Sequence, residues 1–239
     1  VWLCHRCGDR GAWHADTITR SHPPAKPARP QPAPDLSQQE RHDKAMRAIL
    51  DGCRSITPDD AAGRYLASRG LPIPEGAVFF HPRLRHREGQ HWPGMVAVVT
   101  DAPTNEPMTL HRTYLTPEGR KAPVTPRRAI LAGGRKKGGV IRLCYDADIG
   151  LGLGLAEGIE TALSAIARGW SPVWATIDAS NLAAFPVLPG VEALTAFVDH
   201  DPAGTAAFSS VAERWLKAGR EVLHMLPPEG DLNDFIKGH

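Results

Sequence analysis

A regular alternation of strand-like and helix-like segments begins at residue 151, and it constrains the fold more than any other feature of the chain. Strands are predicted over 151–156, 173–176, 193–198 and 221–225, and helices over 159–168, 180–185, 203–218 and 232–237. Strands that alternate with helices need crossover connections. The pattern therefore predicts an α/β fold with a mostly parallel sheet flanked by helices.

Acidic residues follow three of these four predicted strands. Glu157 follows the first, Asp199 and Asp201 follow the third, and Asp231 and Asp234 follow the fourth. An Asp just before a helix is usually a cap, but the strand ends of a parallel sheet meet at one edge, where ligands bind. Carboxylates that gather there repel one another unless a cation lies among them, and hard oxygen ligands suit Mg²⁺ or Mn²⁺. We predict Glu157, Asp199 and Asp201 as catalytic metal ligands, supported by Asp231 and Asp234.

The chain before this alternation has a different composition and pattern. Helices are predicted from Ser37 to about Cys53 and from Thr57 to about Gly70, with Thr57 as the N-cap of the second. Strands are predicted over 78–80, 94–99, 108–115 and 140–143. Residues 37–149 are therefore expected to form a smaller α+β subdomain, followed by the α/β domain at 150–239.

Charge is distributed unevenly along the chain. Residues 1–150 hold 23 Lys and Arg against 15 Asp and Glu, whereas residues 151–239 hold 5 against 11. A basic part beside an acidic site is typical of a surface that brings a polyanion to a metal. The candidate ligands for nucleic acid or nucleotide are His111, Arg112, Arg120, Lys121, Arg127, Arg128, Arg135, Lys136 and Lys137. The alternative to phosphate binding is that these cations lie in a solvated loop without a ligand, especially over 133–139.

The first 36 residues hold two shorter features. Cys4 and Cys7 form a Cys-x-x-Cys followed by Gly8, which is typical of one half of a zinc ribbon, so residues 1–20 are predicted as a partial ribbon. A free dithiol or an incidental pair is the alternative, and Zn²⁺ binding requires the missing ligands from the parent protein. Residues 21–36 are rich in proline and predict an extended linker.

The composition also bears on the surroundings of the protein. Val1 is not an initiator Met, so the chain is expected to begin inside a longer protein. A signal peptide and a membrane span are not predicted. Four Cys do not form a disulfide framework, and a cytoplasmic location is expected.

Two stretches resemble the Toprim family of phosphotransfer domains. They are Leu155-Ala-Glu-Gly-Ile-Glu-Thr-Ala-Leu163 and Phe197-Val-Asp-His-Asp-Pro-Ala-Gly204, with 230–235 similar to the third acidic element of primase-type Toprim domains. The wider order of ribbon, linker, basic subdomain and Toprim domain resembles the primase–helicase proteins of phages and mobile elements. The resemblance implies a DNA primase catalytic core that uses Mg²⁺ or Mn²⁺ to make primers from NTPs on single-stranded DNA. It also implies a helicase as a partner or as a further domain of the parent chain.

Two other functions fit the same residues. A Toprim nuclease would use the same carboxylates to hydrolyse DNA, and an accessory module would bind nucleic acid without catalysis. A topoisomerase is disfavoured, because Tyr65, Tyr114 and Tyr145 lie in no motif that would mark a nucleophile.

Overall fold

The computed structural model describes residues 2–3, 10–11, 36–74 and 76–225. Strands β1 (Trp2–Leu3) and β2 (Arg10–Gly11) pair antiparallel within a separate unit, residues 1–34. Cys4 and Cys7, most of the linker, Asp231, Asp234 and the helix predicted over 232–237 lie outside the described residues. The larger unit, 35–239, holds everything described below.

Two helices open the larger unit. Helix α1 spans Leu36–Leu50 and α2 spans Ala61–Ser68. The predicted N-cap of the second helix is wrong: Asp60 caps it, accepting from Gly63 N at 2.8 Å. Thr57 lies one turn earlier and donates its backbone N–H to Asp60 Oδ2 at 2.7 Å. The Asp60 carboxylate therefore stabilises residues 57–60 as a turn before α2, whereas the sequence pattern had assigned these residues to the helix.

An antiparallel group of strands follows, as predicted for the basic subdomain. Strands β4 (His91–Asp101) and β5 (Pro107–Tyr114) form a hairpin whose turn follows Asp101. Strand β6 was missed, because its three residues hold too little pattern and are identified only by pairing with β5. The strands are β3 (Val78–Arg85), β4 (His91–Asp101), β5 (Pro107–Tyr114), β6 (Arg128–Ile130) and β7 (Gly139–Arg142).

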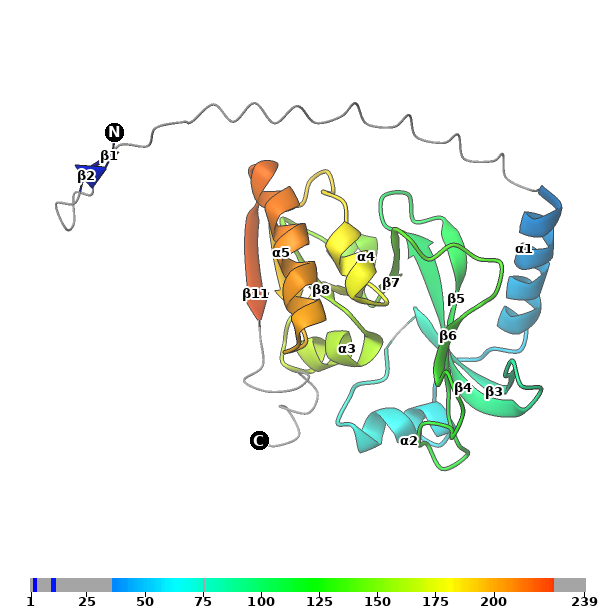
Figure 1. The fold of residues 1–239 in the computed structure, drawn as a ribbon. Coiled ribbons are helices and arrows are strands. Elements are labelled where there is room, and N and C mark those ends of the chain that lie inside the picture. Colours follow the sequence, from blue (N-terminus) through cyan, green and yellow to red (C-terminus); the bar gives the residue numbers. More distant parts are fainter. Residues whose placement is uncertain (1, 4–9, 12–35, 75, 226–239) are drawn as a thin grey trace. The chain divides into compact units, whose positions relative to one another are not determined.

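The C-terminal half confirms the predicted alternation as far as residue 225. Strands β8, β9, β10 and β11 are parallel and lie in the order β11-β10-β8-β9. Strand β11 lies at one edge of the sheet, beside α5 (Figure 1). The elements are η1 (Asp146–Asp148), β8 (Gly152–Ala156), α3 (Ile159–Ala167), β9 (Val173–Ala175), α4 (Ala179–Ala184), β10 (Ala193–Phe197), α5 (Pro202–Lys217) and β11 (Glu221–Met225).

Helices cover both faces of the sheet. Side chains alternate along β8, so Leu153 and Leu155 pack with α4 and α5, whereas Ala156 packs with α3 and α2. The same alternation separates the faces of β4. Val96 packs with Met46 of α1, and Met95 packs on the opposite face in the core that contains α2 and α3. The face that holds Met95 is thus the one turned toward the C-terminal half.

Strand β7 joins the two halves into one nine-stranded sheet. It pairs with β4 through its first two residues and with β9 through its last two. The boundary predicted at 149/150 stays a prediction, because the sheet runs through this region without interruption.

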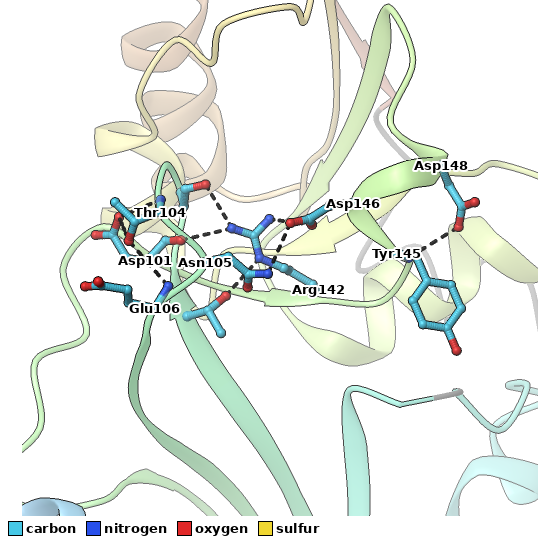
Figure 2. Close-up of polar contacts among 10 residues, drawn as sticks. Asp101, Thr104, Asn105, Glu106, Arg142, Tyr145, Asp146 and Asp148 are labelled. Carbon is cyan, nitrogen blue, oxygen red and sulfur yellow. Dashed lines mark hydrogen bonds and ion pairs between the residues drawn. The ribbon is translucent and has the colours of Figure 1, made fainter.

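Arg142, on β7, fixes this junction (Figure 2). Its guanidinium donates to Asp146 Oδ1 at 2.8 Å, to Thr100 Oγ1 at 3.0 Å, and to the carbonyl oxygens of Asp101 and Ala102, both at 2.9 Å. It also stacks 4.0 Å from the ring centroid of Trp174 on β9. The Arg142 side chain therefore connects the β4–β5 turn, the segment after β7 that holds Asp146, and the parallel strand β9.

Candidate active site

Three neighbouring strands place carboxylates at one edge of the sheet. Glu157 follows β8, Asp178 follows β9 and Asp199 follows β10, and these strands lie side by side in the order β10-β8-β9. The side chains border a pocket of about 210 Å³. Its lining residues are Arg69, Lys121, Arg128, Glu157, Gly158, Glu160, Thr161, Ile177, Asp178 and Asp199.

Glu157 is a pocket carboxylate whose surroundings disfavour its charged form. Burial, followed by repulsion from Asp199 and Asp201, raises its pKa to about 7. Its Oε1 atom is buried and accepts no hydrogen bond from any residue that the structure describes. A buried carboxylate oxygen without a donor is costly, and a proton or a cation relieves that cost.

Gly204, in the first turn of α5, permits this crowding. A Cβ atom at this position would lie 2.7 Å from Glu157 Oε1 and 2.7 Å from the carbonyl oxygen of Asp199. Only glycine allows α5 to approach both strand ends so closely.

The chemistry of these groups fits Mg²⁺, although the ligands are not assembled into a cage. Within 36–74 and 76–225, no group of three His, Cys, Asp or Glu side chains is close enough to hold an ion as it stands. Asp201 is exposed and caps α5, accepting from Gly204 N at 2.7 Å. Mg²⁺ is commonly held by one or two carboxylates together with substrate phosphates and water. Glu157, with its orphaned buried oxygen, and Asp199 meet that need.

Cations from β6 and from the connection that precedes it complete the pocket. Lys121 Nζ lies 3.4 Å from Glu160 Oε1, and Arg128 Nη1 lies 3.6 Å from Glu160 Oε2. Tyr65 of α2 donates its hydroxyl to Glu160 Oε1 at 2.8 Å. Glu160 therefore holds two of the predicted cations beside the acidic strand ends.

The electrostatics of Glu160 follow from these partners. Its burial alone would raise the pKa, but Arg128 and Lys121 outweigh that effect and lower the pKa to about 2. Burial, together with the negative charge of Glu160, raises the pKa of the Tyr65 hydroxyl. At neutral pH the group is thus an ionised carboxylate with a neutral phenol and two cations.

Sequence reasoning did not identify Glu160 or Asp178. Glu160 lies three residues after Glu157, so helical spacing could have placed it on the same side of the strand end. Asp178 follows a predicted strand and caps α4, accepting from Asn181 N at 3.0 Å. Its position after β9 is the same signal that identified the other carboxylates. Tyr65 and Arg69 carry no local signal, since only tertiary packing brings α2 to the pocket.

Three of the predicted phosphate ligands have other roles in the structure. His111 is buried, and burial lowers its pKa to about 4, so it is a neutral core residue. Arg112 donates to the carbonyl oxygens of Arg85 and Ile130, and it lies on the face of β5 opposite to the partners of Arg128. Lys136 pairs with Asp178, so it contacts the rim of the pocket through an ion pair.

The remaining predicted residues are not gathered at the pocket. Four exposed cations do not line it: Arg120, Arg127, Arg135 and Lys137. Four predicted ligands lie outside the described residues: Cys4, Cys7, Asp231 and Asp234. For Zn²⁺ and for a helicase partner, the expectations stay predictions. No helix in the described part of the chain is long and apolar enough to span a membrane.

Two family models match the chain. Residues 152–239 match a Toprim domain family, and residues 40–143 match a family described as a domain of unknown function, DUF7146. No curated protein sequence matches the chain. The C-terminal match covers the alternating strands, the pocket carboxylates and the final residues that the structure leaves undescribed.

Solved primase structures share the fold at low sequence identity. The zinc-binding and RNA polymerase domains of Aquifex aeolicus primase superpose with a TM-score of 0.56 at 18% identity, covering 86% of this chain and 60% of theirs. A DNA primase domain from Pseudomonas aeruginosa gives 0.53 at 15%, covering 84% and 75%. A DnaG primase catalytic domain bound to single-stranded DNA gives 0.54 at 15%, covering 85% and 77%. The chain thus spans less than two thirds of the Aquifex chain.

Proposed function

From the premise that this chain carries a Toprim domain within the fold of primase catalytic cores, we propose that it is a DNA primase core. It would join NTPs on a single-stranded DNA template. The 3′-hydroxyl of one nucleotide attacks the α-phosphate of the next, a phosphodiester bond forms, the hydroxyl proton is released and pyrophosphate leaves.

One observation supports this proposal most. The same pocket is lined by Glu157, Asp199, Lys121 and Arg128, although the two cations lie about 30 to 80 residues away from the carboxylates in sequence. Carboxylates beside cations are what a polyphosphate substrate and its metal require together. A solvated helix cap would need neither the burial of Glu157 nor the cations facing it.

The residues divide the work of phosphate binding. Lys121 and Arg128 would bind the triphosphate or a template phosphate, since Glu160 already aims them toward the pocket. Glu157 and Asp199 would hold Mg²⁺ or Mn²⁺, with Asp201 able to join them. Bound Mg²⁺ would neutralise charge on the attacking and leaving oxygens.

Replacing Asp199 with Ala tests this function. Primer synthesis from labelled NTPs on random single-stranded DNA should fall more than about 100-fold, because a bound metal supplies several kcal/mol of catalysis. Single-stranded DNA binding should be retained, since the carboxylate does not attract phosphate. Asp59→Ala is the matched control: Asp59 is exposed in the turn before α2 and does not line the pocket.

Two outcomes would overturn the proposal. Primer synthesis by the Asp199→Ala protein at the wild-type rate would refute the metal assignment. Cleavage of single-stranded DNA by the wild-type protein with Mg²⁺ alone, without primer synthesis when NTPs are added, would assign the site to a nuclease.

A further inference from the structure

The hairpin β3–β4 carries a row of exposed cations at some distance from the pocket. Arg83, Arg85 and Arg87 occupy alternate positions and are exposed, whereas Leu84 and His86 between them are 2% and 1% exposed. Because side chains alternate along a strand, Arg83 and Arg85 lie on one side of β3, and Arg87 follows in the turn between β3 and β4. We refer to these three residues as the hairpin arginines.

The hairpin arginines have little negative charge near them. Within 36–74 and 76–225, none of the three side chains forms an ion pair or a hydrogen bond. Residues 81–91 contain a single acid, Glu88, which lies 3.8 Å from His86 Nδ1. Three exposed cations that pair with none of the described residues form a surface suited to an external polyanion.

A β-bulge decides which way these arginines face. Between His81 and Leu84 the register shifts, so that three residues of β3 span two residues of β4. Without the bulge, the odd-numbered residues of β3 would continue on the face of Val96, under α1. With it, Leu84 takes that face, and Arg83 and Arg85 turn to the other.

The sheet register connects that other face to the pocket. Arg85 pairs with His91, and His91 shares a face of β4 with Met95, four residues on. Met95 pairs with Thr113, which pairs with Arg128. Arg83 and Arg85 therefore lie on the same face of the sheet as the pocket cation Arg128. Strand rise and spacing put Arg85 roughly 20 Å from Arg128.

Arg54 adds a fourth cation on this side. Its guanidinium lies 4.8 Å from the ring centroid of Phe80, whose partner on β4 is Met95. Arg54 is exposed, so it extends the same basic surface beside β3.

We propose that the hairpin arginines bind the phosphate backbone of the single-stranded template, at a site separate from the catalytic pocket. The inference rests on the proposed function, because that function supplies the strand. Met95 and Thr113, which lie between them on this face, are buried, and Met95 belongs to the core that contains α2 and α3. A template that enters the pocket at Arg128 would therefore reach the hairpin by passing over the outer surface of the helices that cover this face. The contacts are with phosphates, so they hold the strand without reading its sequence.

The test compares two triple variants with equal loss of charge. The first is Arg83→Gln, Arg85→Gln and Arg87→Gln. The control is Arg41→Gln, Lys44→Gln and Arg47→Gln, which removes three exposed cations from α1 on the opposite side of the sheet. Binding of labelled single-stranded DNA is measured by fluorescence anisotropy at salt concentrations from about 50 to about 300 mM. Over this range, counterion release makes the affinity fall measurably as salt increases.

The hairpin variant should bind at least about tenfold more weakly at low salt. The slope of its log affinity against log salt concentration should be smaller than that of wild type by up to about 2, because each lost phosphate contact removes about 0.7 of slope. The control should keep the wild-type slope. The loss should appear with a long oligonucleotide and disappear with one too short to leave the pocket. Circular dichroism and thermal unfolding verify that both variants are folded.

Three results would overturn the proposal. Equal binding by the two triple variants would show that the hairpin arginines do not contact the template. A loss confined to double-stranded DNA would assign the arginines to a duplex instead. Equal losses with short and long oligonucleotides would show a general charge effect. None of these depends on catalysis, so the primer-synthesis assay on the wild-type and Asp199→Ala proteins tests the proposed function separately.

Discussion

Glu160 is a buried carboxylate whose partners come from three parts of the chain. Tyr65 of α2 lies 95 residues before it, Lys121 lies in the connection between β5 and β6, and Arg128 is the first residue of β6. Removing one member of a buried charged group leaves the others unpaired, which costs more than the pair itself contributes. Its contacts are with side chains of the protein, so its effect on the fold should be measurable apart from catalysis.

Replacement of Glu160 with Gln should lower the free energy of unfolding at pH 7 by about 1–3 kcal/mol. Its folded pKa, about 2, lies below the ordinary value of 4.5. The stabilisation is therefore fully present above about pH 4.5 and is lost as pH falls toward 2. Urea unfolding at several pH values should show a wild-type-minus-variant difference that shrinks in this window.

Glu213→Gln is the control for that measurement. Glu213 also pairs with a cation, Lys217, but both side chains are exposed. Its replacement should leave stability unchanged across the same pH range. A difference between wild type and Glu160→Gln that stays constant down to pH 2 would show that the ion pairs do not stabilise the fold.

At the scale of elements, the sequence predicted the types of most helices and strands because their patterns are local. The helix over 159–168 and the strand over 193–198 are observed within one residue of those bounds, since each has a continuous apolar pattern. Elements that depend on residues distant in sequence, or on competing local signals, were harder to predict. Strand β6 was missed, and Asp60 was not recognised as the cap of α2, because Thr57 and Pro58 formed an equally good local signal.

The start of α5 is the element most sensitive to a small change. Replacing Gly204 with Ala would bring a methyl group to 2.7 Å from Glu157 Oε1 and from the Asp199 carbonyl oxygen. Overpacking of this kind costs about 1–3 kcal/mol and moves the helix or the carboxylate. Primer synthesis should fall at least about tenfold, and thermal unfolding should shift down.

Gly150→Ala provides the matched substitution, because an added Cβ there meets no atom within 4 Å. It should leave both activity and melting temperature unchanged. If Gly204→Ala behaved in the same way, the close approach of α5 to Glu157 would not be required for the site.

For the molecule as a whole, the site could be predicted only in part. The carboxylates at strand ends follow from the alternation of strands and helices. Their pairing with Lys121 and Arg128 does not, because it depends on β7 joining two kinds of sheet. Nor could local pattern show that His111 is buried or that Arg112 faces away from Arg128.

Replacing Arg142 with Lys should weaken the coupling between the two halves. Lysine cannot reproduce four hydrogen bonds in a planar arrangement, so the free energy of unfolding should fall by about 2–4 kcal/mol. Urea unfolding followed by tryptophan fluorescence should also show a broader transition with a smaller denaturant dependence.

Arg214→Lys is the comparison for this effect. Arg214 donates to the carbonyl oxygens of Ala183 and Phe185, so its contacts stay within the C-terminal half. It should shift the midpoint without broadening the transition. Equal broadening in both variants would show that Arg142 does not couple the halves.

The shared strand β7 has a consequence for dissecting the protein genetically. The coding sequence assigns β7 to the first half, yet half of its backbone pairs belong to β9 in the second. A gene cut near codon 150 would separate Ile141 and Arg142 from their β9 partners and leave β9 with a bare edge. Bare edges recruit other strands, so each fragment made alone would self-associate. Two fragments produced together would instead associate by pairing β7 with β9, as the halves of a split reporter protein do.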